Sequence, residues 1–160
     1  MNIEELEKRL RIMEDIEEIK KLHLTYVNAL ITCDWDMVDE CFAEHGAVDF
    51  KETGVLRGKQ AVSNDFRERI SKSHIGKEGI FTVHPIISVE GDEAKGNWFF
   101  YSLIYHPREF VDFPEPDRVP DWVQGIYDME YIRERGKWKI SLLKWRSRLM
   151  SNSKLAKKSK

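Results

Sequence analysis

The chain has 160 residues, which is enough for one domain with a single hydrophobic core. Apolar residues make up 41% and charged residues 34%, a balance typical of a folded globular chain rather than a disordered one. The 26 basic and 28 acidic residues give a net charge of −2, so no overall positive field exists to hold a nucleic acid. No apolar run approaches the roughly 18 residues of a membrane span. We therefore expect neither a nucleic-acid nor a membrane partner.

Two cysteines, Cys33 and Cys41, are too few for a disulfide framework or for a structural zinc site of their own. They are interpreted as small buried hydrophobic residues. The first residues are acidic, unlike those of a secretion signal, so a cytoplasmic location is expected. Phosphate-binding glycine loops, paired-cysteine motifs, and the zinc-protease and serine-hydrolase signatures are absent from the sequence.

The first segment, from about Ile3 to Ile31, has the period of a helix. Its apolar residues recur at steps of three and four: Ile3, Leu6, Leu10, Met13, Ile16, Ile19, Leu22, Tyr26 and Leu30. This stripe is too long for one small sheet to cover. Residues 1–13 are therefore predicted to be a helical extension ahead of a domain at 14–150. The extension either packs against a second subunit or stays solvated, and we expect a homo-oligomer, a dimer or a trimer.

Two shorter helices and a strand are predicted next. Asp34 is expected to cap a short helix at Met37–Ala43. The segment Gly46–Val55 is β-like, and Gly58–Ser73 returns to a helical period.

From Phe81 onward the apolar residues recur at every second position, which is the period of a strand and not that of a helix. The predicted strands are 81–84 and 86–89 (one strand or two around Pro85), 94–106, 122–133 and 138–148, with turns at Gly91 and Gly136. Helices followed by an antiparallel meander indicate an α+β fold. Four of the five prolines lie between 107 and 121, which predicts a long loop that is either a lid over a site or a surface excursion. The lysine-rich residues 151–160 are predicted to be a basic, flexible tail.

Several motifs, in this order, resemble the SnoaL-like branch of the nuclear-transport-factor-2-like (NTF2-like) superfamily over roughly residues 14 to 148. They are Ile16 to Leu22 with Tyr26, Asp34-Trp35-Asp36 with Cys41-Phe42, His84-Pro85, Gly91 to Trp98, Gly125 to Asp128, and Gly136 to Ile140. Within the branch the chain is most similar to the group containing scytalone dehydratase, bile-acid dehydratase and lindane dehydrochlorinase. The resemblance implies a cone: a strongly curved antiparallel sheet wrapped around a long N-terminal helix, with two shorter helices and an apolar pocket inside.

For function, the resemblance implies a cofactor-independent lyase or isomerase that removes water or HX from a small hydrophobic, cyclic or aromatic substrate. No metal or organic cofactor is then required. His84 lies where the family has its base histidine, at the entry to the strand before the aromatic one, and an imidazole suits proton abstraction near neutral pH. Tyr26 matches a tyrosine that donates a hydrogen bond to a substrate oxygen. A structural role is the alternative for each of these two residues.

The match breaks at one position. The family's acidic partner of the histidine lies five residues after that tyrosine, where this chain has Ile31. Without the carboxylate, the imidazole loses the group that orients it and supports its charge. Either another acid replaces it, or the reaction is less demanding, or the protein only binds.

Further pocket residues are predicted by position. By strand alternation Trp98 and Phe100 share a face with Ser102, and His106 continues that face to the mouth of the pocket, with solvent exposure as its alternative. The other candidate substrate-binding residues are Tyr127, His23, Arg146 and Arg148. Either arginine could hold a carboxylate or carbonyl, although a surface salt bridge explains them equally well.

Two non-enzymatic alternatives stay open. The chain is either a small-molecule-binding module that has lost the His–Asp dyad, or an assembly subunit like the small subunit of ring-hydroxylating dioxygenases. Ile31 and Ile104, both apolar at family catalytic positions, favour the binding module.

Overall fold

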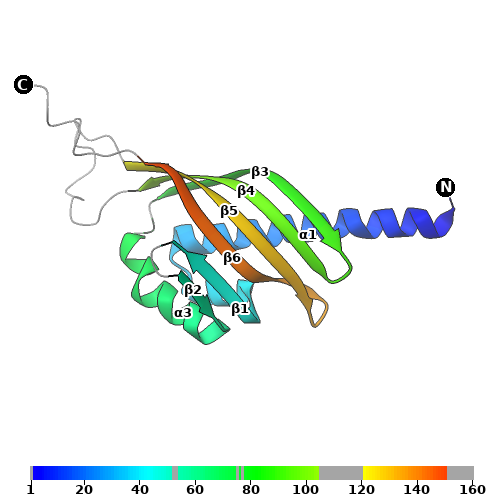
Figure 1. The fold of residues 1–160 in the computed structure, drawn as a ribbon, viewed down its shortest axis with the longest axis horizontal. Coiled ribbons are helices and arrows are strands. Elements are labelled where there is room, and N and C mark those ends of the chain that lie inside the picture. The colour runs from blue at the N-terminus through cyan, green and yellow to red at the C-terminus, as the bar shows by residue number, and fades with distance from the viewer. Residues whose placement is uncertain (1, 52–53, 75, 77, 105–120, 151–160) are drawn as a thin grey trace, which may run out of the picture.

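The computed structural model describes residues 2–51, 54–74, 76, 78–104 and 121–150. Its helices are α1 (Ile3–Thr32), α2 (Trp35–Cys41) and α3 (Lys59–Glu68), with a short 3-10 helix at Ile70–Ser73. Its strands are β1 (Phe42–Phe50), β2 (Gly54–Arg57), β3 (Gly79–Glu90), β4 (Glu93–Ile104), β5 (Asp121–Glu134) and β6 (Lys137–Met150). Figure 1 shows the long strands lying across α1, whose N-terminal part projects beyond the sheet.

The predicted helices form where local chemistry favours them. The side chain of Asn2 accepts a hydrogen bond from the backbone N–H of Glu5 and starts α1. Helix α1 ends at Thr32, and the next residue, Cys33, has a φ of 55° and donates its N–H to carbonyls of the last turn. As predicted, Asp34 caps α2, because its Oδ1 accepts the N–H of Met37 at 3.0 Å.

The sheet is mixed, which corrects the prediction of an antiparallel sheet throughout. The strand order is β2-β1-β6-β5-β4-β3, and β1 runs parallel to β6 while the other pairs are antiparallel. The single strand predicted at Gly46–Val55 is a hairpin of β1 and β2. A parallel pairing between the two ends of the chain leaves no local sequence signal, so the sequence could not show it.

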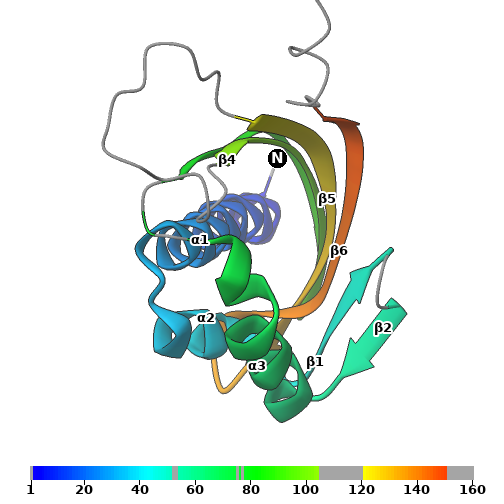
Figure 2. The ribbon, with the colours of Figure 1, turned by 90° about the vertical axis from the view of Figure 1, so that its left-hand side faces the viewer.

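The sheet curls around α1, and α2 and α3 lie against its open side, as Figure 2 shows. This is the α+β cone fold. The face of the sheet toward α1 is called the inner face here and the opposite one the outer face. The inner face and the helices share one apolar core, whose most deeply buried side chains include Ile19, Tyr26, Val38, Phe42, Val48, Phe66, Tyr131, Ile140 and Leu143.

The extension predicted at residues 1–13 is the exposed end of α1. Its apolar side chains Ile3, Leu6, Leu10 and Met13 are exposed, whereas Ile19, the next but one on the stripe, is fully buried. In a single chain the extension is therefore solvated, and contact with a second subunit stays a prediction.

Gly125 is a position where the curved sheet requires glycine. A Cβ there would lie 2.8 Å from the carbonyl oxygen of Arg146 and 3.0 Å from the indole nitrogen of Trp145. We expect Gly125→Ala to lower the free energy of unfolding by about 1–3 kcal/mol, because backbone on the facing strand has to move. Urea unfolding measures this, with Ser147→Ala as the control, since Ser147 pairs with Gly125 but is exposed. An unchanged midpoint for Gly125→Ala would contradict the close approach.

Candidate functional site

An imidazole lies in the middle of the cone. His23, on α1, is fully buried, and its ring stacks on the indole of Trp98 with centroids 3.9 Å apart and planes 7° apart. The ring of Tyr127 lies edge-on to the imidazole of His23, with the two ring centroids 5.6 Å apart. Trp98 and Tyr127 are paired residues on the inner faces of β4 and β5, so α1 and the sheet together hold the imidazole.

A chain of polar groups runs through this cluster. The indole N–H of Trp98 donates to the hydroxyl of Tyr131 at 3.1 Å, and that hydroxyl lies 3.5 Å from Nδ1 of His23. Because the Tyr131 oxygen already accepts the indole N–H, its own proton is available for Nδ1. A neutral imidazole that accepts at Nδ1 carries its proton on Nε2. The Nε2 atom of His23 is buried and has no hydrogen-bond partner. The chain therefore ends in an N–H donor for which no described group is the acceptor.

Burial keeps this imidazole neutral. It lowers the pKa of His23 to about 3, since the cost of removing the charged form from water is not offset by a nearby carboxylate. His23 is therefore a neutral hydrogen-bond donor throughout the physiological pH range. A neutral imidazole of this kind can polarise a carbonyl without carrying a positive charge.

Two tyrosines extend the polar interior. Tyr26, from α1, and Tyr127, from β5, are both buried and hydrogen-bond to each other through their side chains. Burial raises the pKa of each phenol above its ordinary value, so both hydroxyls stay protonated. The interior thus offers two protonated phenols close to the imidazole.

A buried acid lies at the entry to β3. The side chain of Glu78 has no exposed surface, and its Oε2 lies 4.0 Å from Nδ1 of His74. Burial lowers the pKa of His74, while the charge of Glu78 opposes that shift. By alternation along β3, Glu78 continues the row of Ile80 and Thr82, which pair with the inner-face residues Ser102 and Phe100.

The other buried acid among the described residues is Asp15. It accepts hydrogen bonds from Arg133 and from the indole of Trp138, so it is held by a guanidinium. Glu78 instead lies near an imidazole, that of His74, whose Nδ1 forms no hydrogen bond.

The prediction that His84 lies in the interior is wrong. Its side chain is exposed on β3, and its backbone has a φ of 53° inside a bulge between Val83 and Ile86. There its ring lies edge-on to the ring of Phe99 on the outer face, with the two ring centroids 6.1 Å apart. The catalytic role assigned to it therefore loses its geometric basis. The strand begins at Gly79, earlier than predicted, so the residue at its entry is Glu78.

Other predicted residues fall into two groups. Trp98, Phe100, Tyr127, Tyr26 and His23 are all buried in the interior, where the sequence places them. The two arginines are outside it. Arg146 forms an ion pair with Asp49 at 2.8 Å and also donates to the Asp49 carbonyl, and Arg148 lies over the Phe99 ring on the outer face. The salt-bridge alternative therefore fits Arg146, whereas the contact described for Arg148 is with an aromatic ring. His106 lies outside the described residues.

The partners of the buried imidazole in the described structure are aromatic and phenolic. Ile31, at the family's acidic position, is half-buried and packs against the core. In the described part of the chain, no three His, Cys, Asp or Glu side chains are placed to hold a metal ion.

The sequence from residue 11 to residue 144 matches the family model of the SnoaL-like domain. The chain belongs to this family. The match covers α1 from its third turn onward and all of the sheet except the last residues of β6, and it confirms the resemblance seen in the sequence. The SnoaL-like chain has no match among the curated proteins.

Solved structures with the same fold include proteins named as a dehydratase and as a dehydrochlorinase. A candidate scytalone dehydratase from Novosphingobium aromaticivorans is 15% identical, with a TM-score of 0.72 and 87% of each chain covered. The hexachlorocyclohexane dehydrochlorinase LinA-type3 of Novosphingobium barchaimii is 13% identical, with a TM-score of 0.72, and covers 87% of this chain and 90% of its own. The Kfla4162 protein of Kribbella flavida is 17% identical, with a TM-score of 0.74, and the alignment covers 90% of this chain and 97% of the Kfla4162 chain. These likenesses establish the NTF2-like fold.

No helix in the described ranges has the length and hydrophobicity that a membrane crossing needs.

Proposed function

We propose that this SnoaL-like protein is a cofactor-independent lyase or isomerase, dehydratase-like in its chemistry, that acts on a small hydrophobic, cyclic or aromatic substrate inside the cone. The observation that carries the proposal is the buried Nε2–H of His23, which ends a chain of hydrogen bonds and has no partner. Buried polar groups in proteins are normally paired, so an unpaired donor in an aromatic interior marks the place for a ligand oxygen. The names of the dehydratase and the dehydrochlorinase of the same fold support the reaction class.

In this proposal His23 donates to a carbonyl oxygen of the substrate, and the Tyr26–Tyr127 pair supplies a second donor. Water in the pocket takes a proton from the carbon next to the carbonyl, and the electron pair moves onto the oxygen, where His23 stabilises it. When this electron pair returns from oxygen to carbon, hydroxide leaves the neighbouring carbon and forms water with the released proton. Alternatively, the proton is returned to another carbon and the substrate is isomerised.

A non-catalytic binding protein is the second candidate, and Ile31 favours it because the family's acid is missing there. Both cysteines are free thiols, which supports a cytoplasmic location in either case.

The test uses aromatic and steroid-like ketols as probes and begins with binding. We expect at least one ketol to raise the melting temperature of the protein, since a ligand of the native state stabilises it by mass action. His23→Phe keeps an aromatic ring against Trp98 but removes the donor, and should weaken binding of that ketol about tenfold. His45→Phe is the matched control, because His45 is exposed on β1. Equal binding by His23→Phe and the wild type would contradict the assigned donor.

Turnover then separates the two candidate functions. At a saturating concentration of that ketol, His23→Phe should convert it about 10²–10³-fold more slowly than the wild type, because it lacks the donor that stabilises charge on the oxygen. Binding without conversion by the wild type would favour the binding protein.

A further inference from the structure

The hydroxyl of Thr82 is a second polar group that has no partner among the described residues. Its Oγ1 atom is buried and forms no hydrogen bond with any described group, as is also true of Nε2 of His23. The hydroxyl of Ser63, in contrast, is part-buried and donates to the carboxylate of Asp39 at 2.8 Å. A buried hydroxyl without a partner costs free energy and is rare in folded proteins, so the one at Thr82 calls for an explanation.

Strand pairing places Thr82 on the inner face of the sheet. It lies opposite Phe100, which is buried, whereas its neighbour on β3, Phe81, is 58% exposed. Trp98 shares the face of Phe100, two residues away on β4, and is therefore a diagonal neighbour of Thr82 at about 7–8 Å. The imidazole of His23 stacks on the Trp98 ring. The two unpartnered atoms thus lie in one aromatic region, one on the sheet and the other on α1.

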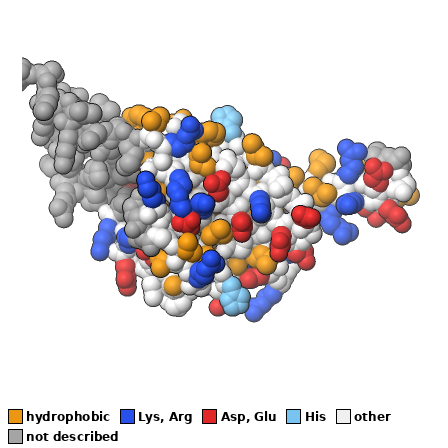
Figure 3. All heavy atoms as spheres, viewed as in Figure 1, with side chains coloured by type: hydrophobic (Ala, Val, Ile, Leu, Met, Phe, Trp, Pro, Cys, Tyr) orange, Lys and Arg blue, Asp and Glu red, His pale blue; other side chains and the backbone are white. Residues whose placement is uncertain are grey.

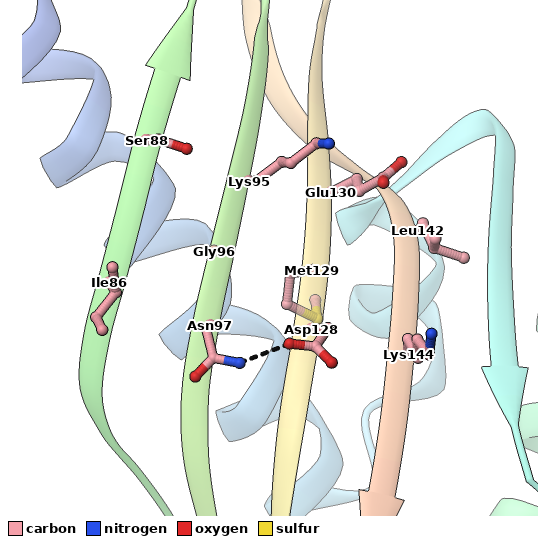
Figure 4. A pocket seen from close by; sticks show the side chains of 10 residues that line it. All are labelled: Ile86, Ser88, Lys95, Gly96, Asn97, Asp128, Met129, Glu130, Leu142 and Lys144. Atoms are coloured by element: carbon pink, nitrogen blue, oxygen red, sulfur yellow. Dashed lines mark hydrogen bonds between the residues drawn. The ribbon is translucent and has the colours of Figure 1, made fainter.

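Polar side chains on the outer face have partners of another kind, because they meet water or one another. Figure 3 shows acidic, basic and hydrophobic side chains intermixed on the side of the molecule that faces the viewer. An open hollow of about 430 Å³ lies on the outer face, and in it Asn97 donates to Asp128 at 2.5 Å, as Figure 4 shows. The unpartnered hydroxyl of Thr82 therefore points to a ligand inside the cone and not to one on this surface.

The two unpartnered atoms suit a ligand that carries two oxygens. The Nε2–H of His23 only donates, so it matches a carbonyl oxygen, whereas the hydroxyl of Thr82 donates and accepts, so it matches a hydroxyl. Two hydrogen bonds of about 2.8 Å each, together with the short distance between the oxygens of a small hydroxy ketone, span the separation of diagonal neighbours. Valine has the same branched shape and suits a strand equally well, so packing alone does not require threonine here.

We propose that Thr82 is a specificity-determining residue, which binds the hydroxyl of a β-hydroxy ketone while His23 binds its carbonyl. In such a ketone one carbon separates the carbonyl carbon from the carbon that bears the hydroxyl. The inference rests on the dehydratase-like function proposed for the interior and narrows its substrate class. The hydroxyl bound by Thr82 is then the one that leaves as water, so this residue selects the substrate and orients its leaving group.

The test compares two probes that differ only in this hydroxyl: a hydroxyindanone with its hydroxyl β to the carbonyl, and indanone, which has hydrogen there. Stopped-flow quenching of tryptophan fluorescence measures both dissociation constants before the probes are converted. We expect the wild type to bind hydroxyindanone about tenfold more tightly than indanone. Thr82→Val should bind the two probes equally and keep the wild-type affinity for indanone. Thr82→Ser, which retains a hydroxyl, should retain the preference.

Equal binding of the two probes by the wild type, or a preference that survives in Thr82→Val, would overturn the role of Thr82. The function proposed for the interior would not be affected, because it depends on the donor at His23. Binding of neither probe would contradict the β-hydroxy ketone class, whereas the wider ketol screen would still decide the function.

The melting temperature of Thr82→Val without a ligand gives an independent check. We expect it to be no lower than that of the wild type, because the variant removes a buried hydroxyl that has no partner. A lower melting temperature for Thr82→Val than for Thr82→Ser would mean that the hydroxyl is paired within the folded chain. The hydroxyl would then not be available to a ligand, and the proposal would be wrong.

Discussion

Acidification from about pH 7.5 to about pH 5 is expected to lower the free energy of unfolding by about 2 kcal/mol through His23 alone. Burial lowers its pKa in the folded state to about 3, from 6.5 in an unfolded chain. Between these two values the unfolded chain binds a proton at His23 that the folded chain does not bind. Stability is therefore fully present above pH 6.5 and falls as the pH drops toward 3, by about 1.4 kcal/mol for each unit.

The variant that isolates this effect is His23→Phe. It removes the titrating group and keeps a ring against Trp98, so its stability should lose about 2 kcal/mol less than the wild type between the two pH values. Whether the variant is more or less stable at neutral pH does not matter, because each protein's loss of stability between the two pH values is measured first and the two losses are then compared. His74, whose pKa burial also lowers, contributes in the same direction in both proteins and cancels.

Urea unfolding at both pH values measures the effect, with all proteins at one concentration so that self-association contributes equally. His45→Phe is the control and should follow the wild type, since His45 is exposed. Equal losses in the wild type and in His23→Phe would mean that His23 is not buried as a neutral ring. The Nε2–H donor proposed for the substrate would then lose its basis too.

Local sequence signals were sufficient for much of the fold. The stripe from Ile3 to Leu30 and the capping residue Asp34 predicted α1 and α2 to within a few residues. The turns at Gly91 and Gly136 located the two hairpins of the long strands. These features depend on residues a few positions apart, where periodicity and capping chemistry act directly. The parallel pairing of β1 with β6 depends on contacts between distant segments, and no short motif encodes it.

The register of β3 explains why the candidate site was only partly predictable. Along this strand both faces carry apolar side chains, with Ile80 on the inner face and Phe81 and Val83 on the outer face. Alternation alone therefore could not tell which set faces the core. The bulge at His84 and Pro85 adds a residue and turns the histidine outward. Once β3 is known to start at Gly79, Glu78 is the polar residue at its entry, and only the structure shows that it is buried beside His74.

The second large effect is expected at Asp15. Its carboxylate accepts the indole N–H of Trp138 at 3.1 Å and a hydrogen bond from Arg133, whose guanidinium lies over the Trp138 ring. We expect Asp15→Ala to lower the free energy of unfolding by about 3 kcal/mol, because it leaves a buried indole N–H without an acceptor and removes the partner of a partly buried cation. Arg133 keeps its contact with Asp92 and is 23% exposed, so the loss stays below the largest values seen for buried pairs.

Asp36→Ala is the matched control for this measurement. Asp36 also meets a guanidinium, that of Arg67 at 2.6 Å, but its side chain is 93% exposed. We expect a change within about 0.5 kcal/mol, since water replaces the lost contact. Asp15→Asn, which keeps an oxygen for the indole but loses the charge, should fall between the two. If the two alanine variants lost equal stability in urea, burial would not be what makes the Asp15 contact strong. Helix α1 would then have to be held in the cone by its apolar stripe alone, from Ile19 onward.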